Sequence, residues 1–134
     1  IAIASGIAAG RRLGENARAT LVTLGQHEAA RLGAAKGARE ETFAGLAGVG
    51  DMMLTANSLT SRNTSLGFAL GEGRALKDIL ESRREVTEGA FSTAAVAALA
   101  RRLEVRMPIT FALDDLLAGR INLEAAVARL IAAF

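Results

Sequence analysis

The chain has 134 residues, of which 51% are hydrophobic and 22% charged, and this composition is typical of one globular domain rather than a disordered segment. Its 16 Lys and Arg stand against 14 Asp and Glu, and the resulting formal charge of +2 gives no reason to expect nucleic acid or an anionic membrane as a partner. With no cysteine and with His27 as the sole histidine, the chain is expected to hold no metal. No apolar run reaches the roughly 18 residues that span a bilayer, so no membrane span is expected and the cytoplasm is the default location.

The hydrophobic pattern predicts helices along the whole chain, because no stretch alternates apolar and polar residues for long enough to form a strand. In chain order, helices are predicted at 1–9, from 15 or 16 to between 33 and 37, at 40–43, from 52 to before 58, and at 62–70, 75–82, 91–103, 108–117 and 122–134. The predicted fold class is therefore all-α, a bundle of roughly seven to nine helices in a single domain over residues 1–134.

Local signals refine several of these boundaries. Asp51 and Ser61 each stand where a helix N-cap belongs, and Pro108 is well placed as the first residue of a helix. The glycines of residues 45–50 predict a tightly turned connection, and residues 85–89 are predicted to be extended. Alanine-rich residues 92–100 and the apolar stripe at 125–134 indicate close helix packing, either within the bundle or across a homodimer.

The densest polar cluster in the sequence consists of two short segments, Asp51 to Thr55 and Ser61 to Asn63. Asp51 and Thr55 are four residues apart, so a carboxylate and a hydroxyl lie on one helical face. Ser61, Arg62 and Asn63 place a hydroxyl, a guanidinium and an amide at a helix start, where free N–H groups favour an anion such as phosphate. The alternative is that Asp51 and Ser61 are ordinary helix caps and Arg62 is a solvated side chain.

The run Gly45-Leu46-Ala47-Gly48-Val49-Gly50-Asp51, followed by Leu54-Thr55 and Ser61-Arg62-Asn63, resembles the substrate-domain signature of the bacterial NAD(P)-dependent glycerol-3-phosphate dehydrogenases. Further segments resemble that family in the same order: residues 1–7, 13–19, 31–33, 87–89 and 107–110. The resemblance implies an all-α domain like the C-terminal domain of 6-phosphogluconate-dehydrogenase-like enzymes, which supplies the substrate side beside an N-terminal Rossmann domain. It also implies a reaction that interconverts dihydroxyacetone phosphate and sn-glycerol 3-phosphate with NAD or NADP and feeds glycerophospholipid synthesis.

The resemblance assigns roles residue by residue. It implies that Asp51 supports catalysis by holding the substrate and the family's catalytic lysine, and that Thr55 lies near the substrate. Ser61, Arg62 and Asn63 match substrate-binding positions, and Arg62 also reaches the cofactor. Two further positions, Val86 and Glu88, match residues that meet the cofactor.

The sequence also departs from the family pattern. The chain begins inside a helix pattern at Ile1, just after the position of the family's Lys-Asn pair, so we expect a piece of a longer protein that lacks the catalytic lysine and the Rossmann domain and is inactive alone. NAD or NADP would then be bound mainly by that absent N-terminal domain. After Asn63, residues 64–67 replace the family's basic and aromatic residues, which weakens the cofactor-side match.

Two rival functions remain at the level of the sequence. The chain could be the C-terminal domain of another two-domain hydroxy-acid dehydrogenase. The occurrence of Ser61-Arg62-Asn63 after Gly50-Asp51 argues against this alternative. It could instead be a non-enzymatic helical module for interaction or DNA binding, which only its size, helicity and the arginine pairs at 11–12, 83–84 and 101–102 suggest.

Overall fold

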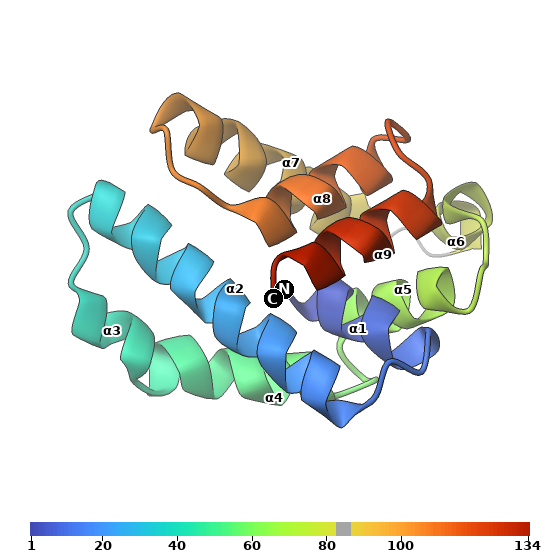
Figure 1. Ribbon diagram of the computed structural model, residues 1–134, viewed down its shortest axis with the longest axis horizontal. Coiled ribbons are helices and arrows are strands. Elements are labelled where there is room, and N and C mark those ends of the chain that lie inside the picture. Colours follow the sequence, from blue (N-terminus) through green and yellow to red (C-terminus); the bar gives the residue numbers. More distant parts are fainter. Residues whose placement is uncertain (83–86) are drawn as a thin grey trace.

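The structure, a computed structural model, describes residues 1–82 and 87–134, and within these ranges it contains helices but no strand (Figure 1). The elements are α1 (Ala2–Gly10), α2 (Glu15–Ala35), α3 (Glu40–Ala44), the π-helical turn η1 (Leu46–Gly50), α4 (Asp51–Asn57), α5 (Arg62–Gly71), α6 (Leu76–Ser82), α7 (Thr87–Arg102), α8 (Pro108–Leu117) and α9 (Leu123–Ala132). The prediction of an all-α fold is confirmed.

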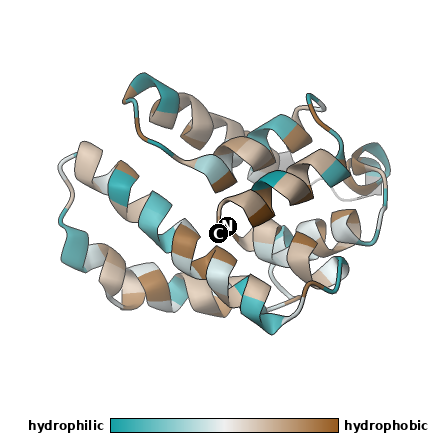
Figure 2. Ribbon diagram, viewed as in Figure 1, coloured by the Kyte–Doolittle hydropathy of each residue, from teal (hydrophilic) through white to brown (hydrophobic). Residues whose placement is uncertain are grey.

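Helix α1 is the central element of the bundle. Six consecutive residues from Ile3 to Ala8 are buried, so this helix is covered on every side. Leu66 and Leu70 of α5 and Leu113 and Leu116 of α8 belong to the same core. Leu21 of α2 and Leu130 of α9 belong to it as well, and in Figure 2 hydrophobic residues of both helices lie toward the centre of the view.

The contact between α1 and α5 is made by glycines. An added Cβ at Gly6 would meet the carbonyl oxygen of Thr64, and one at Gly67 would meet the carbonyl oxygen of Ile3. Gly10 and Gly71, one turn further along each helix, also lie against the opposite backbone. Only residues without a side chain allow two helical backbones to approach this closely.

Helices α8 and α9 form a hairpin whose start is fixed by α2. Pro108 is the first residue of α8, as predicted, and Asn122 caps α9 by accepting a hydrogen bond from Ala125 N at 2.9 Å. The buried carboxylate of Glu28 in α2 accepts from the backbone N–H groups of Ile109 at 2.7 Å and Thr110 at 3.0 Å. These are the free N–H groups of the first turn of α8.

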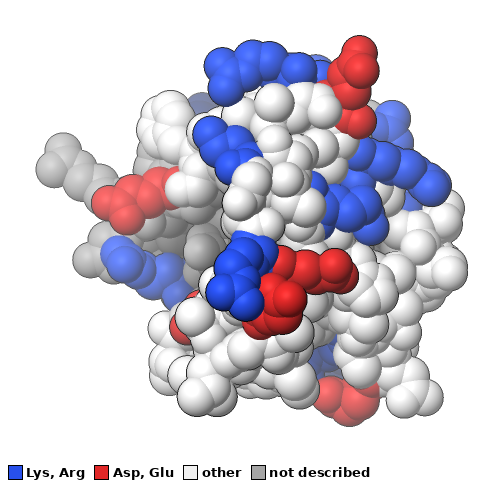
Figure 3. Space-filling view, turned by 90° about the vertical axis from the view of Figure 1, so that its left-hand side faces the viewer, with Lys and Arg blue, Asp and Glu red and all other residues white. Residues whose placement is uncertain are grey.

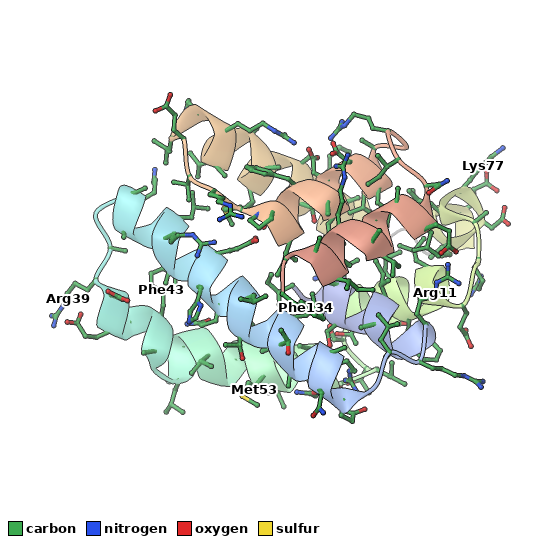
Figure 4. All side chains as sticks on the ribbon, viewed as in Figure 1. Arg11, Arg39, Phe43, Met53, Lys77 and Phe134 are labelled. Atoms are coloured by element: carbon green, nitrogen blue, oxygen red, sulfur yellow. The ribbon has the colours of Figure 1, made fainter. Side chains whose placement is uncertain are left out.

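Helices α3 and α4 and the turn η1 run along the outer side of α2 (Figure 1). Phe43 of α3 points toward α2, where its ring lies against Gly33, and Gln26 of α2 donates a hydrogen bond to the Phe43 carbonyl (Figure 4). Met53 is on the outer side of α4, away from α2, and is 53% exposed. Met53 is therefore not part of the core.

Two predicted local structures differ from those observed. Residues 45–50 were expected to form a turned connection with Asp51 as N-cap, but η1 leads into α4 without a break, and Gly50 and Asp51 both have helical backbone angles (φ −61° and −63°). Because Asp51 is itself helical, its side chain makes no capping hydrogen bond. Ser61, by contrast, caps α5 as predicted.

The segment at 85–89 was expected to be extended. Thr87 to Gly89 instead form the first turn of α7, while Glu85 and Val86 lie outside the described residues. The predicted helix at 91–103 therefore begins earlier than expected. Glu88 in the first turn interacts favourably with the helix dipole, and the alanine-rich run that follows has a high helix propensity. Together these preferences outweigh the preference of the β-branched residue Thr87 for an extended backbone.

The surface carries charges of both signs. In Figure 3 several basic and acidic side chains lie next to one another, and uncharged surface separates these groups. No helix within residues 1–82 and 87–134 is long and apolar enough to cross a membrane. Ala97, Ala100 and Ala126 are 0% exposed and pack within the bundle, whereas Ala94, Ala95 and Ala98 are exposed.

Candidate functional site

Asp51 and Thr55 lie one turn apart on α4 and therefore share a face of that helix. Asp51 is exposed at the junction of η1 and α4, and Thr55 is half-buried. A carboxylate and a hydroxyl on one face can accept and donate hydrogen bonds to the same polar ligand. The shared helical face of Asp51 and Thr55 is as their spacing predicts.

The second polar segment forms the start of α5. The Ser61 hydroxyl oxygen accepts a hydrogen bond from Thr64 N at 3.3 Å, and Arg62 and Asn63 are the first two residues of the helix, both exposed. The Ser61 hydroxyl keeps its hydrogen to donate while it caps the helix. A helix start with an arginine on it favours a bound anion.

One buried hydrogen bond joins these two segments. The hydroxyl of Thr64, a residue that is 0% exposed, donates to the carbonyl oxygen of Thr55 at 2.7 Å. Thr64 thus contacts the last turn of α4 through its side chain and the cap of α5 through its backbone N–H. The candidate residues of α4 and α5 are in this way held in one part of the molecule.

The last turn of α4 receives further donors from α1 and α2. Ser5 Oγ donates to the Ala56 carbonyl at 2.9 Å, and Arg18 Nη2 donates to the same carbonyl at 3.3 Å and to Asn57 Oδ1 at 3.1 Å. The last carbonyls of a helix have no partner within that helix, so these side chains satisfy groups that would otherwise stay unpaired. Helix α4 is anchored at its C-terminal end.

The start of α7 meets the start of α5. An added Cβ at Gly89 would meet Asn63 Oδ1, so the two residues are in contact. Glu88, next to Gly89, is exposed. The structure therefore brings Asn63, predicted to bind substrate, beside the segment that was predicted to meet the cofactor. Val86, the other residue predicted to meet the cofactor, lies outside the described residues.

A largely apolar cavity of about 530 Å³ opens beside this contact. Asn63 and Gly89 are in its wall, together with Phe43, Thr93 and Leu113. Among the described residues that line it, Asp51, Thr55, Ser61 and Arg62 do not occur; they lie on the surface of α4 and the start of α5. The predicted site is thus divided between a cavity wall and an adjoining surface.

The part of the chain that the structure describes contains no group of three or more His, Asp or Glu side chains that could hold a metal ion. The chemistry available at the candidate site is that of hydrogen-bond donors and acceptors with one guanidinium. Such groups can bind and orient a polar, anionic ligand.

Sequence reasoning missed Ser5, Arg18 and Thr64. A signal existed for Thr64, because it is three residues before Gly67 and seven before Gly71 and so lies on the glycine face of α5 that packs on α1. A polar residue on a buried face needs a hydrogen-bond partner. Its partner, the Thr55 carbonyl, could not be found without the tertiary structure.

Comparison with known proteins gives a consistent result. Residues 1–128 match the family described as the NAD-dependent glycerol-3-phosphate dehydrogenase C-terminus. The chain is 50% identical over 131 residues to a glycerol-3-phosphate dehydrogenase [NAD(P)+] of Rhodospirillum rubrum, covering 98% of this chain and 38% of that protein. The corresponding protein of Parvibaculum lavamentivorans is 49% identical, with 98% of this chain and 39% of the relative covered.

A solved structure agrees with these relatives. The crystal structure of glycerol-3-phosphate dehydrogenase from Coxiella burnetii superimposes with a TM-score of 0.91 at 42% sequence identity and covers 97% of this chain. The match takes up 40% of the Coxiella chain. The chain described here therefore spans about two fifths of the length of the relatives that it matches.

Proposed function

Since this chain belongs to the family of NAD-dependent glycerol-3-phosphate dehydrogenase C-terminal domains, we propose that it is the substrate-binding half of an oxidoreductase that interconverts sn-glycerol 3-phosphate and dihydroxyacetone phosphate. The intact protein would carry an N-terminal Rossmann domain that binds most of NAD or NADP. Its place would be the cytoplasm, where it would supply glycerophospholipid synthesis.

The contact between Asn63 and Gly89 carries this proposal. It joins the segment assigned to the substrate with the segment assigned to the cofactor, and hydride transfer requires those two ligands to touch. Both segments are helix starts, and one of them presents Arg62. This arrangement supports a phosphorylated substrate beside a dinucleotide.

In this proposal each described residue binds or orients. Arg62, with its planar set of donors, holds the substrate phosphate and reaches the phosphates of the cofactor, and Asn63 and Ser61 hydrogen-bond to the substrate. Asp51 and Thr55 orient the substrate hydroxyl groups from the facing helix. Exposed Glu88 fits contact with a hydroxyl of the cofactor, which when bound would exchange hydride with C2 of the substrate.

The residue that moves the proton is expected upstream of this chain. The family pattern places its lysine in a Lys-Asn pair, whereas the two lysines present, Lys36 and Lys77, are followed by Gly37 and Asp78. Asp51 would hold that lysine in position as well as the substrate.

The first test compares the intact protein with the 134-residue chain for oxidation of NADH and NADPH by dihydroxyacetone phosphate. We expect turnover by the intact protein alone, and the Arg62→Ala variant should raise the KM for dihydroxyacetone phosphate about tenfold to a hundredfold, because a hydrogen bond to a charged group contributes about 1.5–3 kcal/mol. Arg74→Ala, at an exposed position on another part of the chain, is the matched control.

Two outcomes would contradict the proposal. An unchanged KM in Arg62→Ala would remove the phosphate role of Arg62. Turnover of a carboxylated 2-oxo acid in place of dihydroxyacetone phosphate would instead identify another two-domain hydroxy-acid dehydrogenase.

A further inference from the structure

Side chains from three other helices converge on backbone carbonyls in the last turn of α4, the helix that carries Asp51 and Thr55. Ser5 of α1 and Arg18 of α2 bind the Ala56 carbonyl, and Thr64 of α5 binds the Thr55 carbonyl. Ser5 and Thr64 are 0% exposed, and the Arg18 side chain is 16% exposed. These hydrogen bonds are therefore protected from exchange with water.

Thr64 differs from the other two donors because it belongs to the second candidate segment. Its side chain binds α4 at 2.7 Å, and its backbone N–H binds the Ser61 hydroxyl at 3.3 Å. Between the two helices the chain runs through residues 58–61, where Leu59 and Thr60 are exposed. The buried bond of Thr64 is the direct link between the helix of Asp51 and Thr55 and the helix start of Ser61, Arg62 and Asn63.

From this link we infer that Thr64 is a positioning residue, which sets the distance between the groups that α4 presents to the substrate and those that α5 presents. The inference rests on the proposed function, because it assigns Thr64 a role in that same site. Thr64 touches neither substrate nor cofactor in this scheme. It acts through Asp51 and Thr55, whose helix would shift if the Thr55 carbonyl lost the short bond from Thr64 and kept only the longer bond from Ser58 N at 3.3 Å.

The test uses the intact protein and a series of substitutions at one position. Thr64→Val keeps the shape of the side chain and removes the hydroxyl, Thr64→Ser keeps the hydroxyl and removes a methyl group, and Thr64→Cys supplies a weaker donor. We expect kcat with dihydroxyacetone phosphate to fall about tenfold or more in Thr64→Val, since small misplacements of reacting groups are costly. Thr64→Ser should stay within about threefold of the wild type, with Thr64→Cys between them.

A control variant and a double-mutant comparison separate an effect of Thr64 on the position of α4 from an effect on the stability of the fold. Thr23→Val removes an exposed hydroxyl that bonds only within α2, to the Ala19 carbonyl at 3.0 Å, and should leave kcat unchanged. All kcat values are measured on folded protein, with the folded fraction taken from circular dichroism at the same temperature. If Thr64 acts through Asp51, Thr64→Val should lower kcat much less in an Asp51→Asn background than in the wild type.

The results distinguish this inference from the proposed function. An intact wild-type protein that does not reduce dihydroxyacetone phosphate overturns the proposed function and the role of Thr64 with it. An active wild type in which Thr64→Val keeps full kcat, or in which Thr64→Ser is as impaired as Thr64→Val, overturns the positioning role alone. Should Thr64→Val fail to fold, the order of Thr64→Ser above Thr64→Cys supports the role, and equal kcat values overturn it.

Discussion

Glu28 shows how one buried side chain can organise a helix that is distant in the sequence. It is 1% exposed, and its carboxylate accepts hydrogen bonds from Ile109 N, Thr110 N and Thr110 Oγ1 at 2.7, 3.0 and 2.7 Å. A carboxylate at a helix start is also favoured by the helix dipole. The beginning of α8 is thus capped by a residue of α2.

We expect Glu28→Gln to lower the free energy of unfolding by about 2 kcal/mol, because the amide keeps one acceptor and turns a donor toward a backbone N–H. Urea denaturation followed by circular dichroism measures this change. Glu72→Gln, at an exposed position, is the control and should stay within about 0.5 kcal/mol of the wild type. Equal stability of the two variants would contradict a capping role for Glu28.

Asp51 and Ser61 illustrate at the same scale which residue roles can be inferred from sequence. Both residues stand where the sequence predicts an N-cap, yet of the two only Ser61 caps a helix. The cap at Ser61 depends on its own extended backbone, at φ −65° and ψ 125°. Asp51 continues a π-helical turn made by the glycine-rich residues before it, and this continuation frees its side chain from capping.

At the scale of elements, the pairing of α1 with α5 determines where the candidate site lies. Gly6, Gly10, Gly67 and Gly71 let the two backbones touch, which places Thr64 and the start of α5 beside the last turn of α4. A glycine at these positions would be a cost in an isolated helix. The close approach of the backbones requires it nevertheless.

We expect Gly67→Ala to destabilise the protein by about 1–3 kcal/mol, because the added methyl group would meet the backbone of Ile3, which cannot turn aside as a side chain can. Thermal or urea unfolding measures the change. Gly50→Ala is the matched control, since its Cβ would meet the Leu46 side chain at an ordinary 3.5 Å on a helical backbone, and it should be neutral or stabilise by up to about 1 kcal/mol. A neutral Gly67→Ala would show that α1 and α5 can move apart.

At the scale of the whole molecule, a network of ion pairs ties the C-terminal helices together. Asp114 accepts from Arg101 at 2.9 Å and Arg120 at 2.5 Å, and Asp115 accepts from Arg120 at 2.7 Å and Arg129 at 2.6 Å. Arg101 thus joins α7 to α8. The hydrogen bond from Arg120, assisted by Arg129, lowers the pKa of Asp115 below its ordinary value.

The lowered pKa makes overall stability depend on pH in a defined direction. The Asp115 carboxylate stabilises the folded state fully above its ordinary pKa of 3.8, and this contribution is lost as the pH falls through the lower pKa of the folded state. Asp115→Asn should therefore lower the urea midpoint at neutral pH, and the difference from the wild type should shrink below about pH 4. Asp78→Asn on α6 is the control, and a difference that does not change with pH would contradict the assignment.

The sequence by itself determined the helical class and most helix ends, because those depend on neighbouring residues. Pro108 starts α8 and Asn122 caps α9 through contacts within a few residues of each in the sequence. The family signature was likewise readable as a run of residue types.

The tertiary structure alone decided which of those residues meet. Glu28 reaches Thr110 across 82 positions, and Asn63 reaches Gly89 from another helix. The bond from Thr64 to the Thr55 carbonyl spans only nine positions, yet it forms because the glycine contact of α1 with α5 and the anchoring of α4 hold both helices in place. Hydrogen bonds and steric contacts act over a few ångströms, so their partners are set by how the helices pack.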